Sequence, residues 1–170
     1  MKLLTIIALI LSACASNQKE IISPKEFVSI NSGHDFSIFQ NWKIYPREDK
    51  GDVLVCDYFK EDEVDKRYIV FKNKSGELIY RNIYPVMDTV SYSLEKGDST
   101  EGKVSLELIN TFNALNIYKL TYVTDLNLYL FDLHETTVIY SEKGIDITDI
   151  KQYEEYTKID ANWFYYEGNH

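Results

Sequence analysis

The sequence predicts an α+β fold: an antiparallel β-sheet of several strands with two amphipathic helices, in a single domain. Short runs rich in Tyr, Ile, Val and Phe occur in both halves of the chain, separated by turn signals. These residue types favour strands. Two other stretches place apolar residues three and four positions apart, which indicates helices. The strands come in groups rather than alternating one by one with helices, so we expect both helices on one face of the sheet.

The first half of the chain contains the first group of predicted strands. Turn signals at Lys50-Gly51-Asp52 and at residues 72–76 separate neighbouring runs, and Pro46 ends the second run. The pattern predicts strands at residues 36–39, 42–45, 53–59, 68–71, 77–84 and 90–94.

The two predicted helices lie in the second half. Val104, Leu108, Phe112 and Leu115 recur at helical spacing, with Ile109 on the same side. A second helix opens at Asp146-Ile147-Thr148-Asp149, where Asp146 or Thr148 can accept from free backbone N–H groups. Strand composition returns in the remaining runs at residues 117–123, 126–133, 136–140 and 163–166.

The N-terminus has the layout of a secretory signal. Lys2 precedes an apolar run of nine residues that is too short to span a bilayer, which takes about 20. The run ends in Leu11-Ser12-Ala13-Cys14, which resembles the lipobox of bacterial lipoproteins. The resemblance implies cleavage before Cys14, acylation of its sulfur and attachment to a membrane of the bacterial cell envelope. It also implies the outer membrane in a Gram-negative cell, because Ala15 follows the cysteine.

This layout predicts three segments. Residues 1–13 are the signal peptide, residues 14–25 are the lipidated cysteine with a polar tether, and residues 26–170 are the α+β domain.

Charge and cysteine content limit the possible partners. The net charge of −9 argues against nucleic acid, whose phosphates are neutralised by Lys and Arg. Once Cys14 is acylated, Cys56 is the only other cysteine, so the chain has neither a disulfide nor a cysteine-based metal site. Cys56 lies in an apolar run and is expected in the core. We expect no cofactor.

Three groups of polar residues are candidates for chemistry, and each has a simpler interpretation. In the group Asp132, His134 and Glu135, the first two share one strand face and could hold a cation between them. Metal sites take three or four ligands, however, and the sequence indicates no third or fourth. A turn at a strand end explains these residues more simply. His34-Asp35 has no nucleophile motif nearby and fits a turn. The acidic run at residues 61–65 fits a solvated loop.

The C-terminal run Trp163, Phe164, Tyr165 and Tyr166 is a candidate contact surface. On a strand, Trp163 and Tyr165 share one face, and Phe164 and Tyr166 share the other. If one pair is exposed, its aromatic rings suit a protein interface. The alternative is a strand buried on both faces.

Together these observations predict a non-enzymatic binding protein anchored in the cell envelope, with a protein partner of unknown identity. One version is an immunity-type inhibitor of a toxin, and another is an accessory protein of the envelope. An alternative is an envelope hydrolase that uses a carboxylate pair assembled by the fold. A small-ligand carrier would instead show an apolar cavity of several hundred cubic ångströms.

Overall fold

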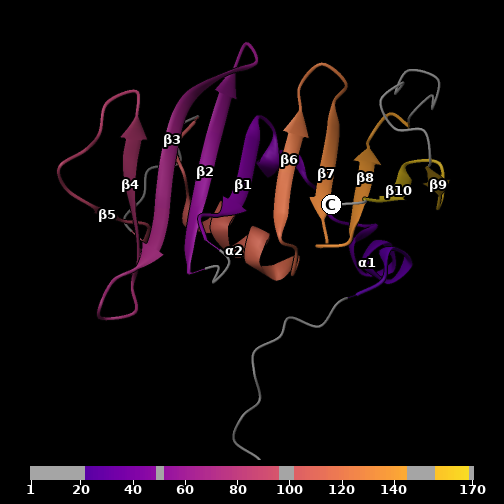
Figure 1. Ribbon diagram of the computed structural model, residues 1–170, viewed down its shortest axis with the longest axis horizontal. Coiled ribbons are helices and arrows are strands. Elements are labelled where there is room, and N and C mark those ends of the chain that lie inside the picture. Colours follow the sequence, from indigo (N-terminus) through magenta and orange to yellow (C-terminus); the bar gives the residue numbers. More distant parts are fainter. Residues whose placement is uncertain (1–21, 49–51, 96–101, 145–155, 169–170) are drawn as a thin grey trace, which may run out of the picture.

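The computed structural model describes residues 22–48, 52–95, 102–144 and 156–168. These residues form one ten-stranded antiparallel sheet with two α-helices and a 3₁₀ helix (Figure 1). The predicted combination of an antiparallel sheet with α-helices is confirmed, although the fold is mostly sheet. The helices are α1 (Pro24–Asn31), η1 (Ser37–Phe39) and α2 (Leu106–Ala114). The strands are β1 (Trp42–Pro46), β2 (Val53–Lys60), β3 (Glu63–Lys72), β4 (Leu78–Tyr84), β5 (Tyr92–Ser93), β6 (Lys119–Val123), β7 (Leu128–Asp132), β8 (Thr136–Ser141), β9 (Thr157–Lys158) and β10 (Trp163–Glu167).

The sheet is built from two similar halves. Its strand order is β5-β4-β3-β2-β1-β6-β7-β8-β10-β9, so β1 and β6 form the centre, with Ile44 opposite Leu120. From β1 the chain runs outward strand by strand to β5. From β6 it runs outward to β8, and it returns from the outermost strand, β9, to β10. A helix precedes each central strand. The sequence shows no corresponding internal repeat, so the similarity lies in the order of the elements.

Each helix packs beneath the strands of the other half. Phe27 of α1 contacts Phe131 of β7 and Trp163 of β10, with ring centroids 5.3 and 6.2 Å apart. Ile109 and Asn113 of α2 lie beside residues of β2, β3 and β4. The two helices thus connect the halves, and both contribute to a single main core.

Alternation along the strands separates the two faces of the sheet. Ile44, Cys56, Tyr68 and Leu120 point toward the helices and are buried in the main core. Their neighbours along the strands point to the opposite face, which no helix of the described residues covers; we call it the open face. Toward β8 and β10, the open face carries a smaller buried cluster of Leu128, Ile139 and Phe164.

The predicted helix at 104–115 is confirmed as α2. Ser105 caps it by accepting from the N–H of Leu108 at 3.1 Å, and Leu108, Ile109 and Phe112 are buried as the spacing predicts. The second predicted helix, from Asp146, lies outside the described residues. So do the signal peptide and Cys14.

Helix α1 was not predicted. It begins at Pro24, inside the segment 14–25 assigned to the tether. Ser23 accepts from the N–H of Glu26 at 3.3 Å, and Pro24 occupies the first turn, where its missing N–H has no cost. Ser23 followed by Glu26 is the spacing of a capping box, a signal already present in the sequence. Neither described α-helix is long or apolar enough to cross a membrane.

Three strand predictions need correction. Residues 36–39 form η1 rather than a strand, because Phe36 and Phe39 are both buried and lie three residues apart, one 3₁₀ turn. Strand β3 begins at Glu63, so most of the acidic run lies in a strand and only Glu61 and Asp62 form the turn. The run 90–94 reduces to the two-residue strand β5.

Candidate functional site

The aromatic strand at the C-terminus is β10, and most of it is packed. Trp163 and Phe164 are each 2% exposed, while Tyr165 and Tyr166 are half-buried. The Trp163 ring lies 4.6 Å from that of Tyr140, on the helix side. Phe164 lies in the smaller cluster on the open face. Both faces of β10 are therefore used for packing, and Trp163 and Phe164 offer no surface to a partner.

Exposed apolar residues gather instead at the other edge of the sheet. Seven large apolar side chains are exposed among the described residues, and five of these lie between residues 84 and 92, in and beside the loop from β4 to β5. Their exposed fractions range from 44% to 72%. We call this group the edge patch: Tyr84, Val86, Met87, Val90 and Tyr92. Exposed apolar side chains concentrated at one edge of a sheet in this way are typical of an interaction site.

Asn82 holds the loop of the edge patch in place. Its side-chain Nδ2 donates to the carbonyl of Val86 at 3.3 Å, and its Oδ1 accepts from the N–H of Tyr84 at 3.3 Å. Its backbone carbonyl accepts from the N–H of Asp88 at 2.9 Å. Beyond the loop, the ring of Tyr92 packs 5.5 Å from that of Tyr80. The loop is thus tied to the sheet at both ends while its apolar side chains face solvent.

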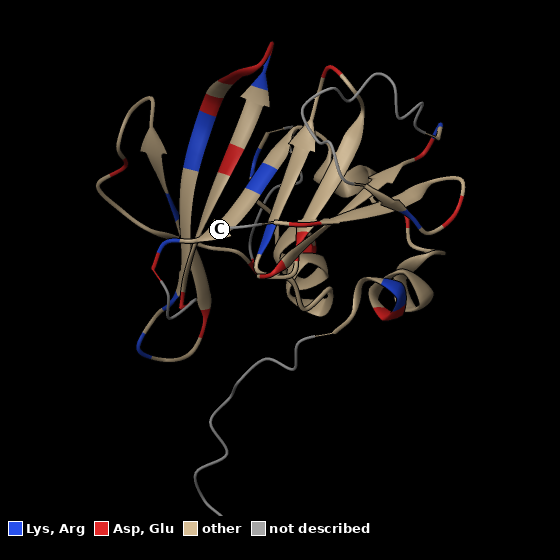
Figure 2. Cartoon of the chain, turned by 45° about the vertical axis from the view of Figure 1, so that its right-hand side comes forward, with Lys and Arg blue, Asp and Glu red and all other residues tan. Residues whose placement is uncertain are grey.

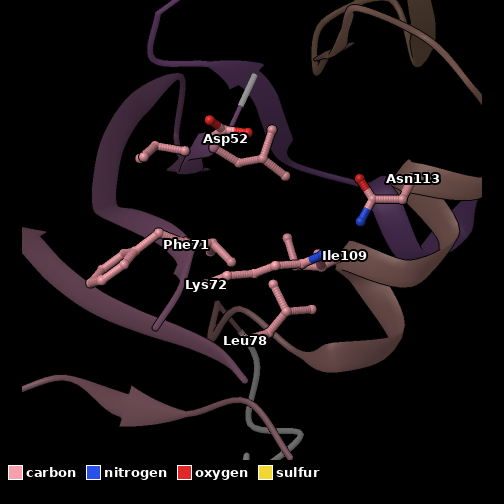
Figure 3. Close-up of a pocket in the computed structure, with 9 residues that line it drawn as sticks. Asp52, Phe71, Lys72, Leu78, Ile109 and Asn113 are labelled. Atoms are coloured by element: carbon pink, nitrogen blue, oxygen red, sulfur yellow. The ribbon is translucent and has the colours of Figure 1, made fainter. Parts of the chain in front are cut away.

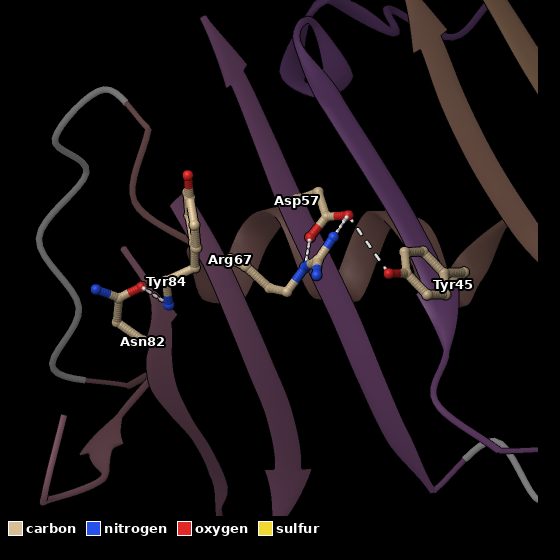
Figure 4. Close-up of polar contacts among 5 residues, drawn as sticks. All are labelled: Tyr45, Asp57, Arg67, Asn82 and Tyr84. Carbon is tan, nitrogen blue, oxygen red and sulfur yellow. Dashed lines mark hydrogen bonds and ion pairs between the residues drawn. The ribbon is translucent and has the colours of Figure 1, made fainter. Parts of the chain in front are cut away.

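An ion pair on the open face lies next to the edge patch (Figure 4). Asp57 of β2 is 2% exposed, and its carboxylate accepts from Arg67 of β3 at two positions: Nε to Oδ1 at 2.5 Å and Nη2 to Oδ2 at 2.9 Å. The hydroxyl of Tyr45 donates to Oδ2 at 3.4 Å. Arg67 faces Tyr84 in the register of β3 and β4, which joins the ion pair to the edge patch.

The ion pair has clear electrostatic consequences. The hydrogen bonds to Asp57 raise the pKa of Arg67 further above its ordinary value. Burial, and then the nearby Asp57 charge, raise the pKa of Tyr45. Since both oxygens of Asp57 are occupied, this cluster does not supply the carboxylate pair that the hydrolase hypothesis requires. The Arg67 side chain is 39% exposed and can still meet a partner.

Acidic and basic residues are interspersed along the strands and hairpin ends in the view of Figure 2. The net charge of −9 is therefore not gathered into one strongly acidic patch on the strands seen there.

The other polar candidates serve local structure. Asp132 accepts from the N–H of His134 at 2.9 Å, and His134 has a φ of 78°, so these residues form the turn between β7 and β8. Asp35 accepts from the N–H of Ser37 at 2.8 Å, which lowers the pKa of Asp35 and fixes the start of η1. No group of three or more metal-ligating side chains occurs among the residues that the structure describes.

Cys56 is a core residue, as the sequence predicts. It is fully buried, with no exposed surface. Burial raises the pKa of its thiol, and the neighbouring Asp57 raises it further, so the nucleophilic thiolate is disfavoured.

Sequence reasoning missed the edge patch, although one signal was present. Residues 82–95 contain several large apolar residues and no Lys or Arg, and Pro85 interrupts them. Because proline has no N–H to donate to a neighbouring strand, a proline within an apolar run indicates an edge strand or a loop. Searches of protein-family models, of curated proteins and of solved structures find no match to this chain.

Proposed function

We propose that this chain is a lipid-anchored, non-enzymatic binding protein of the bacterial cell envelope, and that it holds a protein partner at the edge patch. One observation supports the proposal above all. Five of the seven exposed large apolar side chains in the described residues lie in and beside one loop, whose backbone is tied down by Asn82. A preorganised apolar loop loses little conformational entropy on binding.

A protein partner fits the edge patch better than a lipid surface does. Segments that insert at membrane interfaces carry Lys or Arg beside their apolar residues. In residues 82–95 the only charged side chains are Asp88 and Glu95. Arg67, half-exposed beside Tyr84, adds a polar rim to the apolar patch, and Tyr and Arg are enriched at protein interfaces.

The position of the edge patch suits an anchored binding protein. Helix α1, which follows the tether, packs near β8, whereas the patch lies beside β5 at the far edge (Figure 1). Seven strand spacings of about 4.8 Å separate β8 from β5, or about 34 Å. The patch is thus at the opposite end of the sheet from α1, the helix that follows the tether.

The lipid anchor itself rests on Cys14. The eight residues from Cys14 to Ile21 can span at most about 26–29 Å when extended, so the domain stays close to the membrane surface. We expect Cys14→Ser to move the protein from the membrane fraction to the soluble fraction, and to abolish labelling by a palmitate analogue. Unchanged membrane association of Cys14→Ser would contradict this part of the proposal.

Affinity capture after crosslinking in cells tests the edge patch. The test variant is Val86→Ser/Met87→Ser in the full-length, lipidated protein. The control is Ile30→Ser/Leu126→Ser, which removes two exposed large apolar side chains that the structure describes outside the patch. We expect recovery of the partner to fall about tenfold or more in the test variant and to stay unchanged in the control. Equal recovery from both variants would overturn the proposal.

The number of partners distinguishes the two versions of this function. One stoichiometric partner that is lost from the test variant indicates an inhibitor of the immunity type. Several weak partners, all lost together, indicate an accessory protein of the envelope.

A further inference from the structure

A cavity lies between helix α2 and strands β2–β4, on the helix side of the sheet (Figure 3). Its volume is about 570 Å³. This is within the range of about 300–1,000 Å³ that is usual for small-molecule sites. At about 30 Å³ for each water, it equals the volume of roughly nineteen water molecules. It contains no residue of the edge patch.

The floor of the cavity is apolar. It consists of Leu54, Val70, Leu78 and Ile109, from three strands and one helix. Val70 and Ile109 are buried in the main core, and Leu54 and Leu78 are half-buried beside it. Because all four belong to regular elements of the sheet and helix, the floor is formed without a ligand. It would favour an apolar group of matching size.

The rim of the cavity is polar. It carries Asp52, Lys72 and Asn113, all exposed. In Figure 3 the side chain of Lys72 extends across the opening toward α2, on the side where Asn113 lies. Among the described residues, none of these three side chains forms an ion pair or a hydrogen bond. A ligand can therefore engage them without breaking contacts within the protein.

We propose that this cavity binds a small amphipathic anion. The apolar body of the ligand packs on Leu54, Val70, Leu78 and Ile109, and its anionic group meets Lys72. An anion fits because the Lys72 ammonium extends toward α2, on the side where the Asn113 amide lies, and both groups can donate hydrogen bonds to it. Binding of this ligand in the cavity does not depend on the edge patch.

A fluorescence titration with 8-anilinonaphthalene-1-sulfonate tests the site, since this probe joins an apolar ring system to a sulfonate. The protein is residues 15–170, which keep every described element. We expect saturable binding, weakened about tenfold or more by Lys72→Glu. The matched control is Lys74→Glu, an exposed lysine two residues away that does not line the cavity. It should bind as the unmodified chain does.

Two further variants locate the probe. Leu78→Trp fills the cavity and should abolish saturable binding while the thermal unfolding transition is retained. Val86→Ser/Met87→Ser should leave binding unchanged, which separates the cavity from the edge patch. The proposal is overturned if the unmodified chain does not bind the probe, if Lys72→Glu and Lys74→Glu bind equally, or if the edge-patch variant alone loses binding.

Discussion

Asp57 is the acidic side chain that the fold buries among the described residues, and Arg67 makes that burial tolerable. A carboxylate removed from water is costly unless it is paired and hydrogen-bonded. The register of β2 and β3 places Asp57 directly opposite Arg67, so the partner is supplied by the strand pairing itself. The pair therefore depends on one particular register of this hairpin.

Removing Arg67 should destabilise the protein. Breaking a fully buried ion pair costs about 3–5 kcal/mol. We expect about 2–3 kcal/mol for Arg67→Met, because the side chain of Arg67 is 39% exposed and water can reach the carboxylate when it is gone. Urea unfolding measures this loss. Lys74→Met is the control and should change the free energy of unfolding by less than about 0.5 kcal/mol. If Arg67→Met also lost less than about 0.5 kcal/mol, the stabilising role of the ion pair would be contradicted.

Two buried tyrosines predict a loss of stability in alkaline solution. Burial, followed by neighbouring tyrosines, raises the pKa of Tyr68 and of Tyr129 to about 12, from an ordinary value of 10.0. A group whose pKa is raised by folding stabilises the folded state fully below its unfolded pKa. That stability is lost as the pH rises through the folded pKa. We therefore expect the free energy of unfolding to be steady up to about pH 9 and to fall between pH 10 and 12.

Replacing both tyrosines checks the cause of this fall. Tyr68→Phe/Tyr129→Phe should flatten the dependence on pH between 10 and 12, even though it lowers stability at neutral pH by removing the hydrogen bond from Tyr68 to the carbonyl of Gly102. The same slope in the doubly substituted protein would show that other groups cause the alkaline unfolding.

At the scale of the elements, helix α1 is short and packs beneath β7, β8 and β10. Its eight residues are too few for a helix that is stable alone. It is stabilised by the Ser23 cap at its start and by Phe27, which is fully buried between Phe131 and Trp163.

Truncating Phe27 should therefore affect the whole fold. We expect Phe27→Ala to reduce the free energy of unfolding by about 3–5 kcal/mol. Ile30→Ala, three residues along the same helix, changes a side chain that is 61% exposed and should cost less than about 0.5 kcal/mol. Chemical denaturation of the two variants side by side measures the difference. Similar losses in both would mean that α1 is not packed as described.

The conformation of the loop in the edge patch depends on the hydrogen bonds of Asn82. We expect Asn82→Ala to speed amide hydrogen exchange in residues 84–90, because the hydrogen bonds to Tyr84 and Val86 are lost. Asn73→Ala is a matched control. Asn73 caps the turn between β3 and β4 by accepting from Ser75 and Glu77, so its loss should affect that turn alone. Unchanged exchange in Asn82→Ala would contradict the proposed fixing of the loop.

At the scale of the whole molecule, local patterns predicted most of the elements, and the errors have physical causes. The run 36–39 resembles a strand by composition, but the side chain of Asp35 and the burial of Phe36 and Phe39 favour a 3₁₀ turn. The two-fold order of the sheet leaves no repeated motif in the sequence, because different residues fill equivalent positions, such as Cys56 in β2 and Phe131 in β7.

The candidate site was harder to predict than the fold. Val86, Met87 and Val90 are typical core residues, and only the position of β4 and β5 at the edge of the sheet exposes them. The aromatic run 163–166 shows the opposite case, because Trp163 packs against Phe27 on the helix side and Phe164 packs in the smaller cluster on the open face. Exposure is decided by which strands pair at long range, and that information is not local.

Site-specific photocrosslinking in living cells tests the central claim, that the edge patch holds a protein partner. A photoreactive residue is placed at position 87 in the full-length, lipidated protein. In a second strain it is placed at position 126, an exposed apolar site in the turn between β6 and β7. We predict a discrete adduct with one protein from position 87 and none from position 126. Lipid adducts alone from position 87, no adduct, or the same adducts from both positions would contradict the claim.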